Sequence, residues 1–177
     1  MVNYKIGINR YKGVPASNSL LTKRTQIQGK TMTAVYDKLG LNFMYPENWR
    51  LIDDSDSDMP HVITLETPDG SCTWAVHVYP ASADRDEILK STIASLQETY
   101  EDLEVAPAVA DFGGVEGAGV EAMFYCLDFL IRAELQIVES SEHLFLFWTQ
   151  AEDRVYDEQD LVFKAISVSL LRSLESS

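Results

Sequence analysis

The segment KLGLNFMYPENWRL (residues 38–51) decides how the rest of the chain can fold. From Leu41 to Tyr45, Leu, Phe and Tyr alternate with Asn and Met, which is the two-residue period of a strand with one buried face. Pro46 lacks an N–H and forces the residue before it into an extended conformation, so this strand should end there. The segment therefore predicts a turn at Gly40, a short strand, a corner, and a second strand that opens on an inward-packing Trp49.

The sequence beyond this segment predicts further strands with two helices between and after them. A helix should run from the cap Asp84 to about Tyr100, and a last helix should start at Asp153 or Asp157. We expect an α+β fold with an antiparallel sheet flanked by helices. The predicted strands are Thr31–Asp37, Leu41–Tyr45, Trp49–Ile52, His61–Thr67, Ser71–Tyr79, Leu103–Phe112, Val120–Cys126, Phe129–Val138 and His143–Gln150.

Two of these strands indicate their own place in the sheet. The run His143–Gln150 is apolar on both faces, which is typical of a central strand that is covered on both sides. The run Leu103–Phe112 contains Pro107, which cannot donate to a neighbouring strand, so we expect an edge strand or a bulge.

The clearest hairpin joins His61–Thr67 to Ser71–Tyr79 through Pro-Asp-Gly, a sequence suited to a three-residue loop. In that register His61 lies opposite His77, and two facing imidazoles are a candidate metal or proton site. A two-residue turn would instead place them on opposite faces. Because no third ligand is evident, we expect two unrelated sheet histidines and assign no metal site.

Two other runs resemble binding motifs but lack required residues. The aspartate run at 53–58 begins like a calcium loop, yet Met59 stands where that loop needs Gly and Leu65 where it needs Glu. The glycine run at 113–119 resembles a dinucleotide fingerprint, but a strand follows where a helix is required. We interpret the first as a solvated loop and the second as a turn between strands.

The pattern LGLxFxYPxxW (residues 39–49), with the later elements in matching order, resembles the PsbP-like fold family from about residue 31 to residue 171. That family includes the extrinsic PsbP protein of photosystem II, the Mog-type Ran-release factor and many bacterial domains. The resemblance implies an α/β/α sandwich built on an antiparallel sheet. It implies a binding or assembly role and no particular reaction.

The charge of the chain changes sign near residue 31. Residues 1–30 hold six of the 14 basic residues and no acidic one, so the other 147 residues carry eight basic and all 28 acidic residues, a formal net charge of −20. An acidic body of this size disfavours nucleic acid and anionic lipid and favours a partner with a basic surface. We expect no nucleic-acid partner and no membrane span.

The chain is expected to hold one domain, residues 31–177, preceded by a basic and mostly irregular arm, residues 1–30. The arm has three open interpretations: a disordered tail, a segment that docks on the acidic body, or an extension that is not native, with Met32 as the true start. An export signal is not evident, and Cys72 and Cys126 form no CxxC, so we expect free thiols and a cytoplasmic location.

No nucleophile elbow, HExxH motif or Cys/His cluster points to catalysis, so we assign no catalytic residue and no cofactor. The function expected is a non-catalytic binding or assembly module, for protein–protein interaction or a chaperone-like role. One alternative is a small-ligand or metal-binding domain, with a cleft lined by Trp49, Trp74 or Trp148. A second alternative is an enzyme of unknown class.

Overall fold

The computed structural model describes residues 32–54 and 59–175, which belong to one compact unit, Met32–Ser177. The predicted arm, residues 1–30, and residues 55–58 of the aspartate run lie outside the described residues. The helices are α1 (Arg85–Thr99) and α2 (Asp153–Glu175). The strands are β1 (Thr33–Lys38), β2 (Leu41–Pro46), β3 (Arg50–Asp53), β4 (His61–Glu66), β5 (Cys72–Pro80), β6 (Glu104–Asp111), β7 (Glu116–Cys126), β8 (Phe129–Glu139) and β9 (His143–Glu152).

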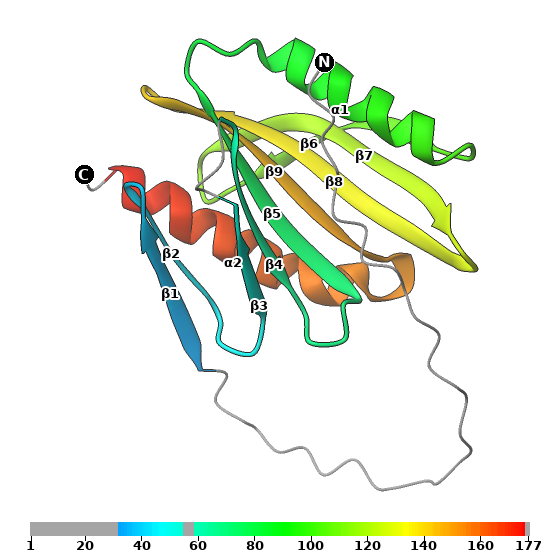
Figure 1. The fold of residues 1–177 in the computed structure, drawn as a ribbon, viewed down its shortest axis with the longest axis horizontal. Coiled ribbons are helices and arrows are strands. Elements are labelled where there is room, and N and C mark those ends of the chain that lie inside the picture. Colours follow the sequence, from blue (N-terminus) through cyan, green and yellow to red (C-terminus); the bar gives the residue numbers. More distant parts are fainter. Residues whose placement is uncertain (1–31, 55–58, 176–177) are drawn as a thin grey trace, which may run out of the picture. The chain divides into compact units, whose positions relative to one another are not determined.

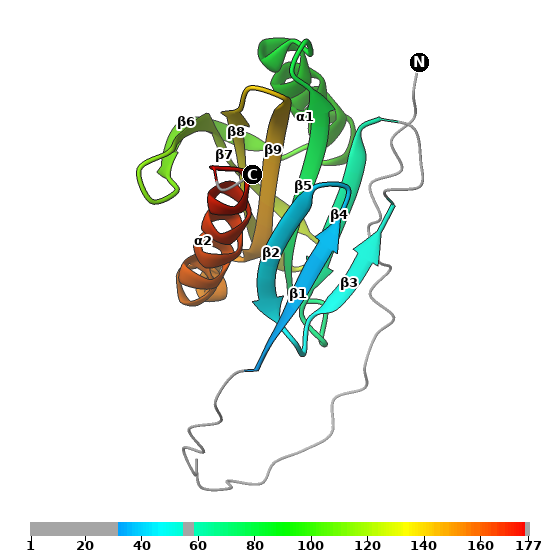
Figure 2. The ribbon, with the colours of Figure 1, turned by 90° about the vertical axis from the view of Figure 1, so that its left-hand side faces the viewer.

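Seven of these strands form one antiparallel sheet in the order β3-β4-β5-β9-β8-β7-β6, while β1 and β2 pair as a separate antiparallel ribbon (Figure 1). Helix α1 packs on one face of the sheet. Helix α2 and the ribbon lie side by side on the other face (Figure 2). The α+β class with an antiparallel sheet flanked by helices is therefore confirmed.

Strand β9 occupies the middle of the sheet, as the apolar pattern of both its faces predicts. Phe145 and Phe147 belong to the core under α2, whereas Leu144, Leu146 and Trp148 belong to the core under α1. Each of these side chains is at most 5% exposed. Strand β6, which contains Pro107, lies at the sheet edge, so that prediction is confirmed as well.

The corner and the turn in the opening segment form as expected, and the N–H of Trp49 donates to the carbonyl of Pro46 across the corner. Leu39 and Gly40 make the two-residue turn between β1 and β2, with φ angles of 56° and 75°. Trp49 is 8% exposed and packs edge-on against Phe163 of α2, with 6.0 Å between ring centroids. The predicted inward packing of Trp49 is confirmed, and β3 begins one residue later than predicted, at Arg50.

The predicted register of the β4–β5 hairpin is wrong by one residue. The N–H of Thr67 donates to the carbonyl of Cys72, so the loop between them has four residues instead of three. Inside the loop, the carboxylate of Asp69 accepts hydrogen bonds from the hydroxyls of Thr67 and Ser71 and from the backbone N–H of Ser71. These bonds stabilise the four-residue loop. Because the register differs from the predicted one by a single residue, residues that were expected to face each other lie on opposite faces of the sheet.

Both helices begin where the sequence indicates. The carboxylate of Asp84 accepts hydrogen bonds from the backbone N–H groups of Asp86 and Glu87, which caps α1. Helix α2 starts at Asp153, the first of the two predicted positions.

Only the first part of the glycine run forms the predicted turn between strands. Gly113 and Gly114 have positive φ angles and connect β6 to β7. Strand β7 begins at Glu116, four residues earlier than predicted, because Gly117 and Gly119 pair within the sheet. The neighbouring strand β8 approaches Gly119 so closely that a Cβ atom there would meet the backbone of Leu135.

Candidate functional site

The two histidines considered as a metal pair do not face each other. His61 is paired with Val78, and His77 is paired with Val62, so the imidazoles lie on opposite faces of the sheet. His77 stacks between Trp148 and Tyr79 on the α1 side. Burial there lowers the pKa of His77 from 6.5 to about 4. Within residues 32–54 and 59–175, no three His, Cys, Asp or Glu side chains gather closely enough to hold a metal ion.

The other residues singled out by the sequence lie in the core or in turns. Trp49, Trp74 and Trp148 are all less than 9% exposed and fill the two cores, so they line no open cleft. Cys72 is buried and Cys126 is half-buried, and both are free thiols.

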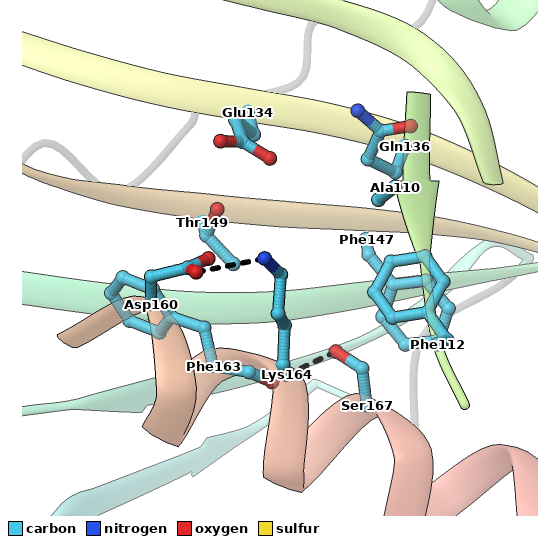
Figure 3. A pocket seen from close by; sticks show the side chains of 10 residues that line it. All are labelled: Ala110, Phe112, Glu134, Gln136, Phe147, Thr149, Asp160, Phe163, Lys164 and Ser167. Atoms are coloured by element: carbon cyan, nitrogen blue, oxygen red, sulfur yellow. Dashed lines mark hydrogen bonds and ion pairs between the residues drawn. The ribbon is translucent and has the colours of Figure 1, made fainter. Parts of the chain in front are cut away.

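A small cavity with both apolar and polar lining residues lies between helix α2 and the sheet (Figure 3). Its volume is about 20 Å³. Strands β8 and β9 provide its ceiling, α2 its floor, and Phe112 closes one side (Figure 3). The lining residues are Ala110, Phe112, Glu134, Gln136, Phe147, Thr149, Asp160, Phe163, Lys164 and Ser167.

Gln136 is the unusual residue of this cavity. Its side chain is 3% exposed, and neither its amide oxygen nor its amide nitrogen has a hydrogen-bond partner among the described residues. Most buried polar atoms in folded proteins are hydrogen-bonded, because an unpaired one loses its interaction with water without replacement. We call this space the Gln136 cavity.

The polar side chains around the Gln136 cavity have their own partners. Lys164 donates to Asp160 at 2.8 Å, and the hydroxyls of Thr149 and Tyr156 lie 2.6 Å apart. Burial raises the pKa of Glu134, while the nearby guanidinium of Arg132 opposes that increase.

Arg132 is the centre of an ion-pair network next to the cavity. Its nitrogens lie 2.7 Å from a carboxylate oxygen of Glu121, 3.3 Å from Glu134 and 3.1 Å from Asp157. The guanidinium carbon also lies 4.5 Å from the ring centroid of Tyr156. This network links α2 to strands β7 and β8. The guanidinium of Arg132 therefore has a structural role.

The sequence contains a signal for this cluster that sequence reasoning did not use. In β8, the polar residues Arg132, Glu134 and Gln136 alternate with apolar ones, which is also typical of a solvent-facing strand surface. Only the position of α2 shows that these side chains are covered.

A second surface stands out at the hairpin that joins β7 to β8. Tyr125, Leu127 and Phe129 are 57%, 72% and 43% exposed. The register pairs Tyr125 with Leu130 and Cys126 with Phe129, so apolar side chains lie on both faces of the hairpin and Leu127 at its end. We call residues Tyr125–Phe129 the β7–β8 tip.

Acidic residues lie in this apolar tip and at one side of it. Tyr100 and Leu103 pack against the cluster that contains Phe124, so Glu101 and Asp102 between them lie beside the tip. Figure 1 shows the end of α1 and the β7–β8 hairpin at the same end of the sheet. The tip itself carries the exposed Asp128.

The solved structures that resemble this chain share its architecture. The solution structure of cyanobacterial PsbP (CyanoP) from Synechocystis matches with a TM-score of 0.55 at 12% identity, covering 84% of this chain and 96% of that one. The domain has the PsbP-like fold. The predicted resemblance is therefore confirmed at the level of the fold.

Two further structures are similar. A protein of Bacteroides thetaiotaomicron matches with a TM-score of 0.50 at 11% identity over 73% of this chain, which spans 43% of that protein. The Ran-binding protein Mog1p of Saccharomyces cerevisiae gives a TM-score of 0.46 at 9% identity, over 81% of this chain and 95% of that one. A scan against protein-family models gave no match, and neither did a search of curated proteins. At these identities the likeness concerns the fold alone.

Neither helix in the described part of the chain is both long enough and apolar enough to cross a membrane.

Proposed function

We propose that this PsbP-like domain is a non-catalytic protein-binding module that contacts its partner with the β7–β8 tip. The observation that carries the proposal is the exposure of Tyr125, Leu127 and Phe129 on one hairpin end. Clustered exposed apolar side chains of this size are typical of interaction sites, and aromatic residues are frequent among those that contribute most to binding.

The backbone at the tip gives a second reason. Leu127 has a φ of 57°, the left-handed region in which a leucine is strained by roughly 1 kcal/mol. Glycine or asparagine would adopt this conformation at lower cost, and neither would expose an apolar side chain. Leu39 at the β1–β2 turn has a similar φ, so what singles out Leu127 is this backbone together with the exposed rings of Tyr125 and Phe129 beside it.

The surroundings of the tip indicate the chemistry of the partner. Asp128 belongs to the tip, and Glu101 and Asp102 lie at the same end of the sheet; we call these three exposed residues the acidic rim. A partner surface with an apolar pocket and surrounding Lys or Arg side chains would complement both features. The acidic rim disfavours an anionic membrane as the occupant.

The test compares two exposed leucines that have nearly the same φ angle. Leu127→Asn removes the apolar side chain from the tip, and Leu39→Asn makes the same change at the β1–β2 turn, where φ is 56°. Wild type is used to capture and identify a stoichiometric partner from native lysate, and the purified partner is then titrated with all three proteins. We expect Leu127→Asn to weaken binding about tenfold or more and Leu39→Asn to leave it unchanged.

Equal affinity of the partner for wild type and Leu127→Asn would contradict the proposal, as would an equal loss in Leu39→Asn. Increasing salt should also weaken binding, because the acidic rim acts through charge.

We further propose that the domain acts in the cytoplasm, where Cys72 and Cys126 would remain the free thiols seen in the fold. Cell fractionation with an antibody against the chain tests that location.

A further inference from the structure

We propose that the Gln136 cavity is a binding site for one ordered water molecule that links strand β8 to helix α2. The proposal concerns a part of the fold away from the β7–β8 tip and does not depend on the function proposed above. It starts from the buried amide of Gln136, which has no partner among the described residues.

The volume of the cavity limits which molecules can occupy it. A space of about 20 Å³ is enough for one water molecule and too small for an organic ligand. An apolar cavity of this size would stay dry, but this one has polar side chains on its ceiling and floor (Figure 3).

The hydrogen-bonding capacity left over around the cavity matches what a water needs. Gln136 has a free acceptor and free donors. Lys164 uses one of its three N–H groups in its bond to Asp160, and Glu134 accepts from Arg132 through one carboxylate oxygen. A water between these groups would donate to Gln136 or Glu134 and accept from Lys164, which gives it the usual two to four partners.

Other groups at the cavity are already satisfied or unsuitable. Ser167 accepts from the indole N–H of Trp74 and donates to the carbonyl of Phe163, so its hydroxyl proton is committed. The ammonium of Lys164 disfavours a metal cation in the same space. Water is therefore the occupant that fits both the volume and the charge.

This arrangement explains how a glutamine is tolerated beneath α2. A buried water that makes several hydrogen bonds is part of the structure and is costly to remove. It would couple the amide on β8 to the polar side of α2, which the direct hydrogen bonds of the described residues do not do at this position.

The test uses the full chain in two measurements. A high-resolution crystal structure should show one peak within hydrogen-bonding distance of the Gln136 amide. In solution, the side-chain amide protons of Gln136 should give NMR cross-peaks to a long-lived water, whereas those of the exposed Gln97 should give only the signals of fast-exchanging surface water. In Gln136→Met the density peak should be lost.

Three results would overturn the inference. The first is a well-defined cavity without density together with no long-lived water signal at Gln136. The second is a direct hydrogen bond from the Lys164 ammonium to Gln136 that fills the space. The third is a peak with the short, numerous oxygen contacts of a metal ion. The wild-type measurements decide between these outcomes even if Gln136→Met fails to fold.

Discussion

Gly119 of β7 lies so close to Leu135 of β8 that a Cβ atom at position 119 would stand 1.7 Å from the carbonyl oxygen of Leu135. Real Cβ atoms do not approach other atoms to this distance, and the obstructing atom is backbone instead of a movable side chain. The approach brings β7 and β8 together beside Gln136, which is the pairing partner of Gly119.

We therefore expect Gly119→Ala to lower the free energy of unfolding by about 3 kcal/mol or more, because the two strands must move apart. Urea denaturation measures the change. In a strand without this contact the same substitution is neutral or stabilising, since glycine has the larger conformational entropy in the unfolded chain. A stability equal to that of wild type would show that β7 and β8 are less closely packed here.

The buried hydrogen bond from the indole N–H of Trp74 to the hydroxyl of Ser167, at 2.9 Å, joins β5 to α2. Both side chains are at most 1% exposed, so Ser167→Ala leaves a buried donor without a partner. We expect a loss of about 1–3 kcal/mol in the free energy of unfolding. A double-mutant cycle with Trp74→Phe should give a coupling energy well above zero, and additive effects would mean that the bond contributes nothing.

The lowered pKa of His77 predicts that stability depends on pH. The unfolded chain takes up a proton on this side chain near pH 6.5, whereas the folded chain does so only near pH 4. Protonation therefore favours the unfolded state as the pH falls from 6.5 to 4. Over this range the free energy of unfolding should decrease by about 3 kcal/mol or less on account of His77.

His77→Phe keeps an aromatic ring next to Trp148 and removes the titrating group. Between pH 6.5 and 4 the variant should lose less stability than wild type, as measured by denaturation at a series of pH values. Parallel curves for the two proteins, or an NMR titration of His77 near pH 6.5, would contradict this prediction.

The turn at Leu39 and Gly40 should be improved by Leu39→Asn. Both positions have positive φ angles, and Asn-Gly is the favoured sequence for a two-residue hairpin turn of this type. Because Leu39 is 55% exposed, little packing is lost, and we expect a gain of about 1 kcal/mol in the free energy of unfolding. A lower thermal midpoint in the variant would indicate that the leucine side chain contributes to packing.

Pro107 should protect the outer edge of the sheet against pairing with another chain. The N–H of Phe112 donates to the carbonyl of Val115 and so points toward β7. Because backbone N–H groups alternate in direction along a strand, those of even-numbered residues in β6 point toward β7 and the nitrogen of Pro107 points away from it. Proline has no N–H there, and it interrupts the row of donors on the edge strand.

Pro107→Thr restores that donor and should increase self-association, which analytical ultracentrifugation over a range of concentrations measures. Ala106→Thr is the matched control, because the N–H of residue 106 points toward β7. If the two variants associate to the same extent, the missing donor of Pro107 is not the protective feature.

Several features of this fold follow from short stretches of sequence. The apolar alternation before Pro46, the cap at Asp84 and the proline in β6 each act on their neighbours within a few residues. The doubly apolar run His143–Gln150 likewise predicts the central strand, because a strand hidden on both sides must be apolar on both sides. Local physical chemistry therefore determines the element types, their order and the place of β9.

Tertiary structure decided three things that the sequence leaves open. The β4–β5 register depends on the loop that the hydrogen bonds of Asp69 stabilise. The register differs by one residue from the predicted one, and this difference places His61 and His77 on opposite faces of the sheet. The burial of Gln136 depends on α2 packing over β8. The exposure of Leu127 depends on the β7–β8 hairpin end, over which none of the described helices or strands packs. The burial of Gln136 and the exposure of Leu127 are set by residues far apart in the chain, whereas the register is set by which of several possible loops closes around Asp69. A sequence pattern reports only the preferences of near neighbours.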